Sequence, residues 1–125
     1  MGTEMKSVLV VDDNPLNGTL ATTVLQRAGY EVHCVDRAEL ALEFLKSTRV
    51  DIVLTDIGMP GMSGKDLARI LRECMQEQCP RLVAYTAYAL EHQQQAIVDA
   101  GFDAIVIKPA RSATLVAALE GHPSA

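Results

Sequence analysis

The sequence predicts a doubly wound α/β domain, in which a parallel sheet of five strands carries five helices on its two faces. Five short runs rich in β-branched or aliphatic residues alternate with five stretches of helical pattern along 125 residues. Strands separated by helices run parallel and are joined by right-handed crossovers. Hydrophobic residues make up 49% of the chain, which is enough for one domain with one core.

The five expected strands differ in their hydrophobic pattern. The runs at 8–11, 52–55 and 104–107 are nearly continuous in apolar residues, as in strands buried on both faces. The run at 31–35 alternates apolar and polar residues, which favours an edge strand. The remaining strand is expected at 82–86.

The expected helices are marked by their caps and by apolar spacing. The helix at 15–28 follows Asn14, a good N-cap, begins with Pro15 and ends before Gly29. The helix at 63–75 begins with a serine followed three residues later by an aspartate, the spacing of a capping box. The apolar face of this helix is expected to carry Leu67, Ile70, Leu71 and Cys74. The other helices are expected at 38–46, 89–100 and 112–120.

Composition excludes several classes of protein. The net charge is −5 and the pI about 5.1, so direct nucleic-acid binding is disfavoured. No apolar run is long enough to span a membrane, and the N-terminus lacks a secretory signal, so we expect a cytoplasmic protein, or the cytoplasmic domain of a membrane-bound sensor kinase, without membrane contact of its own. A monomer is the default expectation. The three cysteines form no C-x-x-C pair and are expected to be reduced thiols.

Polar side chains follow four of the five strands. Asp12 and Asp13 come after the first strand, Asp56 after the third, Thr86 ends the fourth, and Lys108 follows the fifth. Ligands of doubly wound folds bind at the carboxyl ends of the strands, so these five side chains are expected to converge on one site. Singly each has an ordinary structural explanation, but together they indicate function.

This set of residues fits phosphoryl transfer through a metal. Carboxylates about 4 Å apart repel by roughly 4 kcal/mol per pair at an effective dielectric constant of about 20, so a cation is expected among them. Oxygen ligands favour a hard ion such as Mg²⁺, or Mn²⁺. A carboxylate beside a metal can attack phosphorus, while Lys108, the Thr86 hydroxyl and the backbone amide of Ala87 stabilise the phosphoryl oxygens.

Four motifs resemble those of the receiver (response-regulator, CheY-like) domains of two-component phosphorelay signalling. They are VLVVDDNPLN at 8–17, DIVLTDIGMPGMSG at 51–64, LVAYTA at 82–87 and AGFDAIVIKPA at 100–110. The resemblance implies a flavodoxin-like sheet with strand order 2-1-3-4-5. Residues 1–125 are then a single receiver domain, with a core at about 7–119 and frayed ends at 1–5 and 121–125.

The resemblance also implies a role for each site residue. Asp56 is the phosphoacceptor, Asp13 and Asp56 ligate Mg²⁺ together with the Gly58 carbonyl, and Asp12 acts through water. Thr86 and Lys108 hold the phosphoryl group, and the bond between Lys108 and Pro109 is expected to be cis. The implied donor is phosphohistidine on a bacterial histidine kinase or histidine phosphotransfer domain. The domain would catalyse its own phosphorylation and dephosphorylation.

Two positions bear on how such a domain would work. Many receivers carry an aromatic residue where Ile105 stands, so the usual aromatic switch is absent here. Tyr88 lies two residues after Thr86 and is large enough to shield an acyl phosphate from water, although it is equally a candidate for a partner surface. Together with KPA at 108–110, Ile105 favours a phosphoryl way-station within a hybrid histidine kinase, which relays phosphate to a phosphotransfer domain.

Other classes of protein remain as alternatives. A free-standing regulator that acts by protein–protein interaction has the same site. An aspartyl phosphatase of the haloacid-dehalogenase type needs a second aspartate where Gly58 stands. The glycines at 58, 61 and 64 are spaced G-x-x-G-x-x-G, which is not the spacing of a dinucleotide-binding loop.

Overall fold

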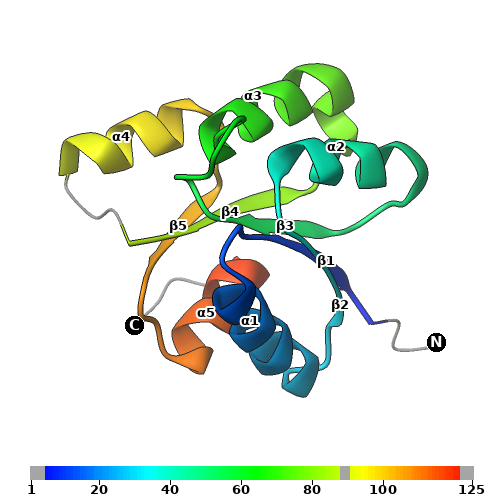
Figure 1. Cartoon of the computed structure of the whole chain (residues 1–125), viewed down its shortest axis with the longest axis vertical. Coiled ribbons are helices and arrows are strands. Elements are labelled where there is room, and N and C mark those ends of the chain that lie inside the picture. Colours follow the sequence, from blue (N-terminus) through cyan, green and yellow to red (C-terminus); the bar gives the residue numbers. More distant parts are fainter. Residues whose placement is uncertain (1–4, 88–90, 122–125) are drawn as a thin grey trace.

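A computed structural model, which describes residues 5–87 and 91–121, contains one five-stranded parallel sheet (Figure 1). The strand order is β2-β1-β3-β4-β5, which confirms the fold class and order expected from the sequence. The strands are β1 (Ser7–Val11), β2 (Glu31–Val35), β3 (Ile52–Thr55), β4 (Arg81–Thr86) and β5 (Ala104–Ile107).

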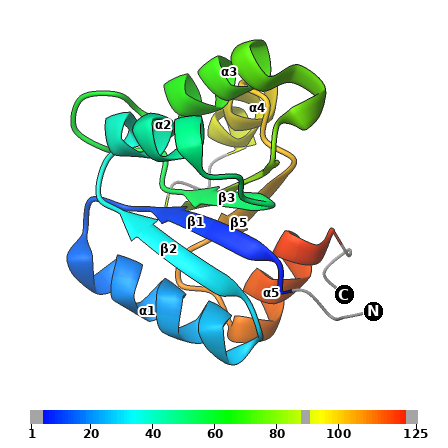
Figure 2. The ribbon, with the colours of Figure 1, turned by 90° about the vertical axis from the view of Figure 1, so that its right-hand side faces the viewer.

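Helices cover both faces of the sheet. Figures 1 and 2 show α2, α3 and α4 on one face and α1 with α5 on the other. The helices are α1 (Pro15–Arg27), α2 (Ala38–Ser47), α3 (Gly64–Met75), α4 (Glu91–Asp99) and α5 (Ser112–Glu120), and a short 3₁₀ helix, η1 (Gln76–Gln78), follows α3. Each α-helix was expected, whereas η1 was not. Positions 89 and 90 of the expected fourth helix lie outside the described residues.

The sheet divides the core into two hydrophobic clusters, one under each helical layer. Strands β1 and β3 are buried along nearly their whole length, as their continuous apolar runs predicted. The same expectation was wrong for β5, because this strand lies at the edge of the sheet, where Ile107 is 40% exposed. β4 takes the inner position instead and is buried at four of its six residues. The exposed edge position of β2 agrees with its alternating pattern.

Local signals in the sequence fix the helix starts. The Asn14 side chain accepts hydrogen bonds from the first turn of α1, and α3 begins with the expected capping box at Ser63. The expected apolar face of α3 was wrong at Cys74, which is exposed. The buried face of this helix carries Leu67, Ala68 and Leu71, and it continues to Met75, which is partly buried. These positions are spaced by one and two helical turns, so the face is centred away from Cys74.

None of the helices within residues 5–87 and 91–121 combines the length and the apolar character that crossing a bilayer requires.

Candidate functional site

The backbone brings the expected site residues to one edge of the sheet. The strand ladders continue beyond the strand ends: the Asp12 N–H donates to the Val35 carbonyl (3.2 Å), and the Asp56 N–H donates to the Val11 carbonyl (2.9 Å). Between β4 and β5, at the other end of the strand order, the Lys108 N–H donates to the Thr86 carbonyl (2.9 Å). The parallel register therefore fixes these residues as neighbours although they are far apart in sequence.

Three carboxylates form a cluster at this edge. One oxygen from each of Asp12, Asp13 and Asp56 lies within 4.8 Å of the other two. Asp12 is buried, Asp56 is partly buried and Asp13 is exposed, so the cluster opens to solvent on the Asp13 side. A set of three carboxylate oxygens with open positions suits a hard divalent cation that keeps part of its water shell. The residues present therefore fit the metal that the sequence suggested.

Lys108 closes the other side of the cluster. Its Nζ lies 2.8 Å from Asp12 Oδ2 and 3.5 Å from Asp56 Oδ2, and its side chain is only 15% exposed. Burial alone would lower the pKa of Lys108, but the hydrogen bond to Asp12 and the charges of both carboxylates outweigh burial, so the pKa lies above its ordinary value. The ammonium is thus charged beside Asp56.

The two inner carboxylates are held in fixed orientations. Asp56 Oδ1 accepts a hydrogen bond from the Ile57 N–H (2.7 Å), which leaves Oδ2 facing Lys108. Asp12 Oδ1 accepts from the Asn14 N–H (2.9 Å) and its Oδ2 from Lys108. Burial raises the pKa of Asp56 above its ordinary value, with Asp12 adding to the rise, although Lys108 and the Ile57 N–H both act to lower it.

Gly64 has a structural role that the sequence reasoning missed. Its N–H donates to the Ile57 carbonyl (2.9 Å), and a Cβ at this position would collide with the Asp56 carbonyl oxygen. The first residue of α3 therefore lies directly against the backbone of the Asp56 segment. A glycine at the first helical position, immediately after the N-cap serine, is the signal that could have revealed this close approach.

The other predicted residues differ in burial. Thr86 is fully buried at the end of β4, and Ala87 follows it exposed. Gly58 is exposed in the loop between β3 and α3. Ile105 is partly buried and packs against the cluster under α2, α3 and α4. The Lys108–Pro109 peptide bond is cis, as expected. Tyr88 lies outside the described residues.

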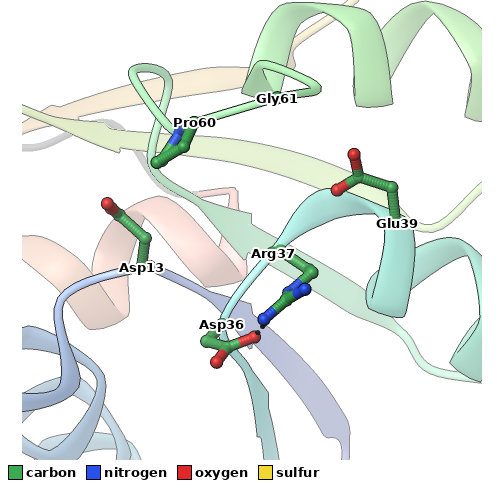
Figure 3. Close-up of a pocket in the computed structure, with 6 residues that line it drawn as sticks. All are labelled: Asp13, Asp36, Arg37, Glu39, Pro60 and Gly61. Carbon is green, nitrogen blue, oxygen red and sulfur yellow. Dashed lines mark hydrogen bonds and ion pairs between the residues drawn. The ribbon is translucent and has the colours of Figure 1, made fainter.

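A pocket of about 630 Å³ opens beside the acidic cluster (Figure 3). Three loops border it, each following one of the strands β1, β2 and β3. Asp13 stands on one side with its carboxylate directed toward Pro60, and the Arg37–Asp36 ion pair (3.1 Å) stands across from it. It is lined by Asp13, Asp36, Arg37, Glu39, Pro60 and Gly61.

An acidic cluster with a lysine at the carboxyl edge of a 2-1-3-4-5 sheet is the arrangement of a receiver domain. Residues 8–120 match the family described as "Response regulator receiver domain". The chain belongs to this family and is a receiver domain of two-component signalling.

Individual relatives agree with the family assignment. The chain is 35% identical over 105 residues to the sensor histidine kinase GacS of Pseudomonas protegens; the match covers 82% of this chain and 12% of GacS. It is 31% identical to the polar-differentiation response regulator DivK of Brucella anthropi, covering 83% of this chain and 85% of DivK. The chain therefore spans about an eighth of the length of the kinase and most of the regulator.

A solved structure agrees as well. The receiver domain of the sensor histidine kinase PA1611 of Pseudomonas aeruginosa PAO1 superposes with a TM-score of 0.85 at 28% identity, covering 94% of this chain and 97% of that one. That structure is described with a magnesium ion coordinated in its active-site cleft.

Proposed function

We propose that this receiver domain accepts a phosphoryl group on Asp56 from a phosphohistidine, in a reaction that depends on Mg²⁺ or Mn²⁺. The observation that carries the proposal is the arrangement around Asp56: two further carboxylates within 4.8 Å on one side and the Lys108 ammonium at 3.5 Å on the other. An aspartate with a purely structural role, such as a helix cap, does not require two further carboxylates and an ammonium around it. The transfer forms an oxygen–phosphorus bond on Asp56 while the nitrogen–phosphorus bond of the donor breaks.

The residues of the chain divide the work of holding the reacting groups. Asp13 and Asp56, with the Gly58 carbonyl, would hold the metal, and Asp12 would act through a water molecule. The bound ion supplies positive charge to the phosphoryl oxygens. Lys108 supplies a second positive charge, fixed beside the Asp56 carboxylate by Asp12.

The end of β4 would bind the remaining phosphoryl oxygens. The Thr86 hydroxyl and the Ala87 backbone N–H lie in consecutive residues where the strand leaves the sheet, and both groups can donate hydrogen bonds. Tyr88, which lies outside the described residues, is proposed to limit the access of water to the acyl phosphate.

The proposed donor and acceptor partners are a histidine kinase or a histidine phosphotransfer domain. The start of α1, which directly follows the acidic pair, carries two exposed leucines: Leu16 is 66% exposed and Leu20 is 56% exposed. Residues four apart lie on the same side of a helix, so these leucines form one apolar strip beside the site. An apolar strip next to the reacting carboxylate favours docking of a protein donor over use of small molecules alone.

We favour a place within a hybrid histidine kinase, with Asp56 passing its phosphoryl group on to a phosphotransfer domain. Similarity to GacS supports this context, whereas similarity to DivK supports a free-standing regulator. Phosphorylated protein should then lose its phosphoryl group to phosphotransfer domains of the same organism far faster than to water. Absence of back-transfer to every such domain would leave the free-standing regulator. A cytoplasmic location is part of the proposal, because the donor kinase uses ATP.

The direct test uses a small phosphoryl donor with Mg²⁺ and intact-mass spectrometry. We expect a stable gain of one phosphoryl group that requires the cation and that Asp56→Asn abolishes. Asp36→Asn, which changes an exposed carboxylate at the rim of the pocket, is the matched control and should accept the group normally. Steady consumption of donor without an adduct would indicate an aspartyl phosphatase instead.

A further inference from the structure

Tyr85 lies beside the site without belonging to the residues assigned above. It immediately precedes Thr86 in β4, and successive side chains of a strand point to opposite faces of the sheet. Tyr85 is therefore directed toward the layer of α1 and α5, where it packs, partly buried, against the cluster that contains Val83 and Val106.

The Tyr85 ring contacts the ammonium that faces Asp56. Lys108 Nζ lies over this ring, 5.1 Å from its centroid, within the range of a cation–π interaction. An ammonium carries three N–H bonds, of which the two carboxylates can take two. Because the Lys108 side chain is 85% buried, the attraction of the ring face is less screened than at an exposed site.

We propose that Tyr85 is a positioning residue for phosphoryl uptake, whose ring face holds the Lys108 ammonium between Asp12 and Asp56. The proposal rests on the function assigned to Asp56 above. In the unphosphorylated protein the ammonium is nearer to Asp12 (2.8 Å) than to Asp56 (3.5 Å), so negative charge that arrives on Asp56 favours a shift of the ammonium toward it.

A ring face suits this movement better than another hydrogen-bonding group. Hydrogen bonds weaken steeply as their angle changes, whereas the π face attracts a cation over a broad area. The Lys108 ammonium can therefore move between the two carboxylates and keep the ring as a partner throughout. The long, flexible lysine stem loses less freedom in the reaction when the ring already limits its range.

The position of Tyr85 separates this role from an aromatic switch in β5. Ile105 packs against the cluster under α2, α3 and α4, whereas Tyr85 packs against the cluster under α1 and α5. The two side chains therefore lie on opposite faces of the sheet. Tyr85 acts on the site through Lys108 and does not fill the space that an aromatic residue at 105 would occupy.

The test compares three replacements that separate ring charge from ring volume. Tyr85→Phe keeps the negative ring face and removes the hydroxyl. Tyr85→Leu keeps an apolar side chain and removes the ring. Pentafluorophenylalanine in place of Tyr85 keeps the ring size but reverses the charge of its face.

Two measurements are made on each protein. The first is the proton chemical shift of the Lys108 Cε methylene without donor, which a ring 5.1 Å from Nζ shifts upfield. The second is the maximal rate of phosphoryl uptake at saturating small donor and Mg²⁺. We expect Tyr85→Phe to keep the upfield shift and a rate within about twofold of the wild type. The leucine variant should lose the upfield shift. Both the leucine and the fluorinated variants should accept the phosphoryl group about 3- to 30-fold more slowly than the wild type, which is the range that corresponds to cation–π energies.

Several results would overturn the inference. One is an unshifted Lys108 methylene in the wild type. Others are a fluorinated variant that reacts as fast as the wild type, or a phenylalanine variant as slow as the leucine variant, which would assign the effect to the hydroxyl. If the wild type itself accepts no phosphoryl group, the proposed function fails, and the chemical shifts still decide whether the ring holds the lysine.

Discussion

Replacing Asp56 by asparagine is expected to stabilise the folded domain at neutral pH, although it removes the carboxylate proposed to accept the phosphoryl group. The side chain of Asp56 is 16% exposed, and its carboxylate lies within 4.8 Å of an oxygen of Asp12. At an effective dielectric constant of about 20, this repulsion is at least about 3 kcal/mol, while the attraction of Lys108 at 3.5 Å is about 5 kcal/mol. Asp13 is equally near but exposed, so solvent screens its repulsion more strongly, and the attraction and the repulsions nearly offset one another.

Burial therefore decides the sign of the effect. Removing an ion from water costs several kcal/mol, and this cost is what raises the pKa of Asp56 above its ordinary value. Asparagine keeps the oxygen that accepts from the Ile57 N–H and carries no charge. We expect Asp56→Asn to raise the free energy of unfolding at pH 7 by about 1–2 kcal/mol.

The gain should depend on pH and on the metal. A carboxyl whose folded pKa is raised stabilises the fold below its unfolded pKa, which is 3.8, and loses that contribution as the pH rises through the folded value. The advantage of asparagine should therefore be present at pH 7 and vanish below about pH 4. Mg²⁺ should reduce the difference in free energy of unfolding between Asp56→Asn and the wild type, since a cation at ten times its Kd stabilises the wild-type fold by about 1.4 kcal/mol.

Urea unfolding from pH 3.5 to 8, with and without Mg²⁺, measures each part of this prediction. Asp36→Asn is the control: its carboxylate is 60% exposed and pairs with an exposed arginine, so its effect should stay within about 0.5 kcal/mol. A loss of stability in Asp56→Asn at pH 7 would refute the reasoning, because it would mean that attraction to Lys108 outweighs the cost of burial.

Three further changes test the structure around the site. Gly64→Ala should lower the free energy of unfolding by about 2–4 kcal/mol, because its Cβ collides with the backbone of Asp56; unchanged urea unfolding would contradict this close approach. Arg72→Met should lower the free energy of unfolding by about 1–3 kcal/mol, because Arg72 donates two hydrogen bonds to the Gly101 carbonyl (2.8 and 2.6 Å). If Arg72→Lys were as stable as the wild type in urea unfolding, the pair of hydrogen bonds from the guanidinium would not be the cause. Burial, helped by a nearby glutamate, raises the pKa of Tyr30 from 10.0 to about 12, so wild-type stability should fall by up to about 3 kcal/mol between pH 10 and 12; Tyr30→Phe should show a smaller fall in urea unfolding over that range.

Most of the fold could be predicted because local signals were consistent with one another. Cap residues such as Asn14 and Ser63 determine where helices begin, and short apolar runs between them leave few alternatives to parallel strands. The errors concern burial. The apolar run of β5 was expected inside and lies at an edge, and Cys74 was expected on a buried face and is exposed.

The position of the five polar residues at one edge of the sheet could be predicted because one rule, that ligands bind at the carboxyl ends of parallel strands, converts chain positions into a place in space. The contact between Tyr85 and Lys108 and the approach of Gly64 to Asp56 could not be identified in this way. Tyr85 and Lys108 lie 23 residues apart in the sequence, and no local pattern joins them, while Gly64 is one glycine of a loosely spaced series.

The sequence by itself determined the order of the elements, the caps and the residue types at each strand end, because these depend on neighbours a few positions away. Only the tertiary structure decided that the Lys108 ammonium lies nearer to Asp12 than to Asp56 and over the ring of Tyr85. Those distances depend on strand register, twist and the packing of two helical layers, each of which joins segments 20 to 100 residues apart. Electrostatic interactions change strongly over such short distances, so the properties of Asp56 are determined by the folded domain.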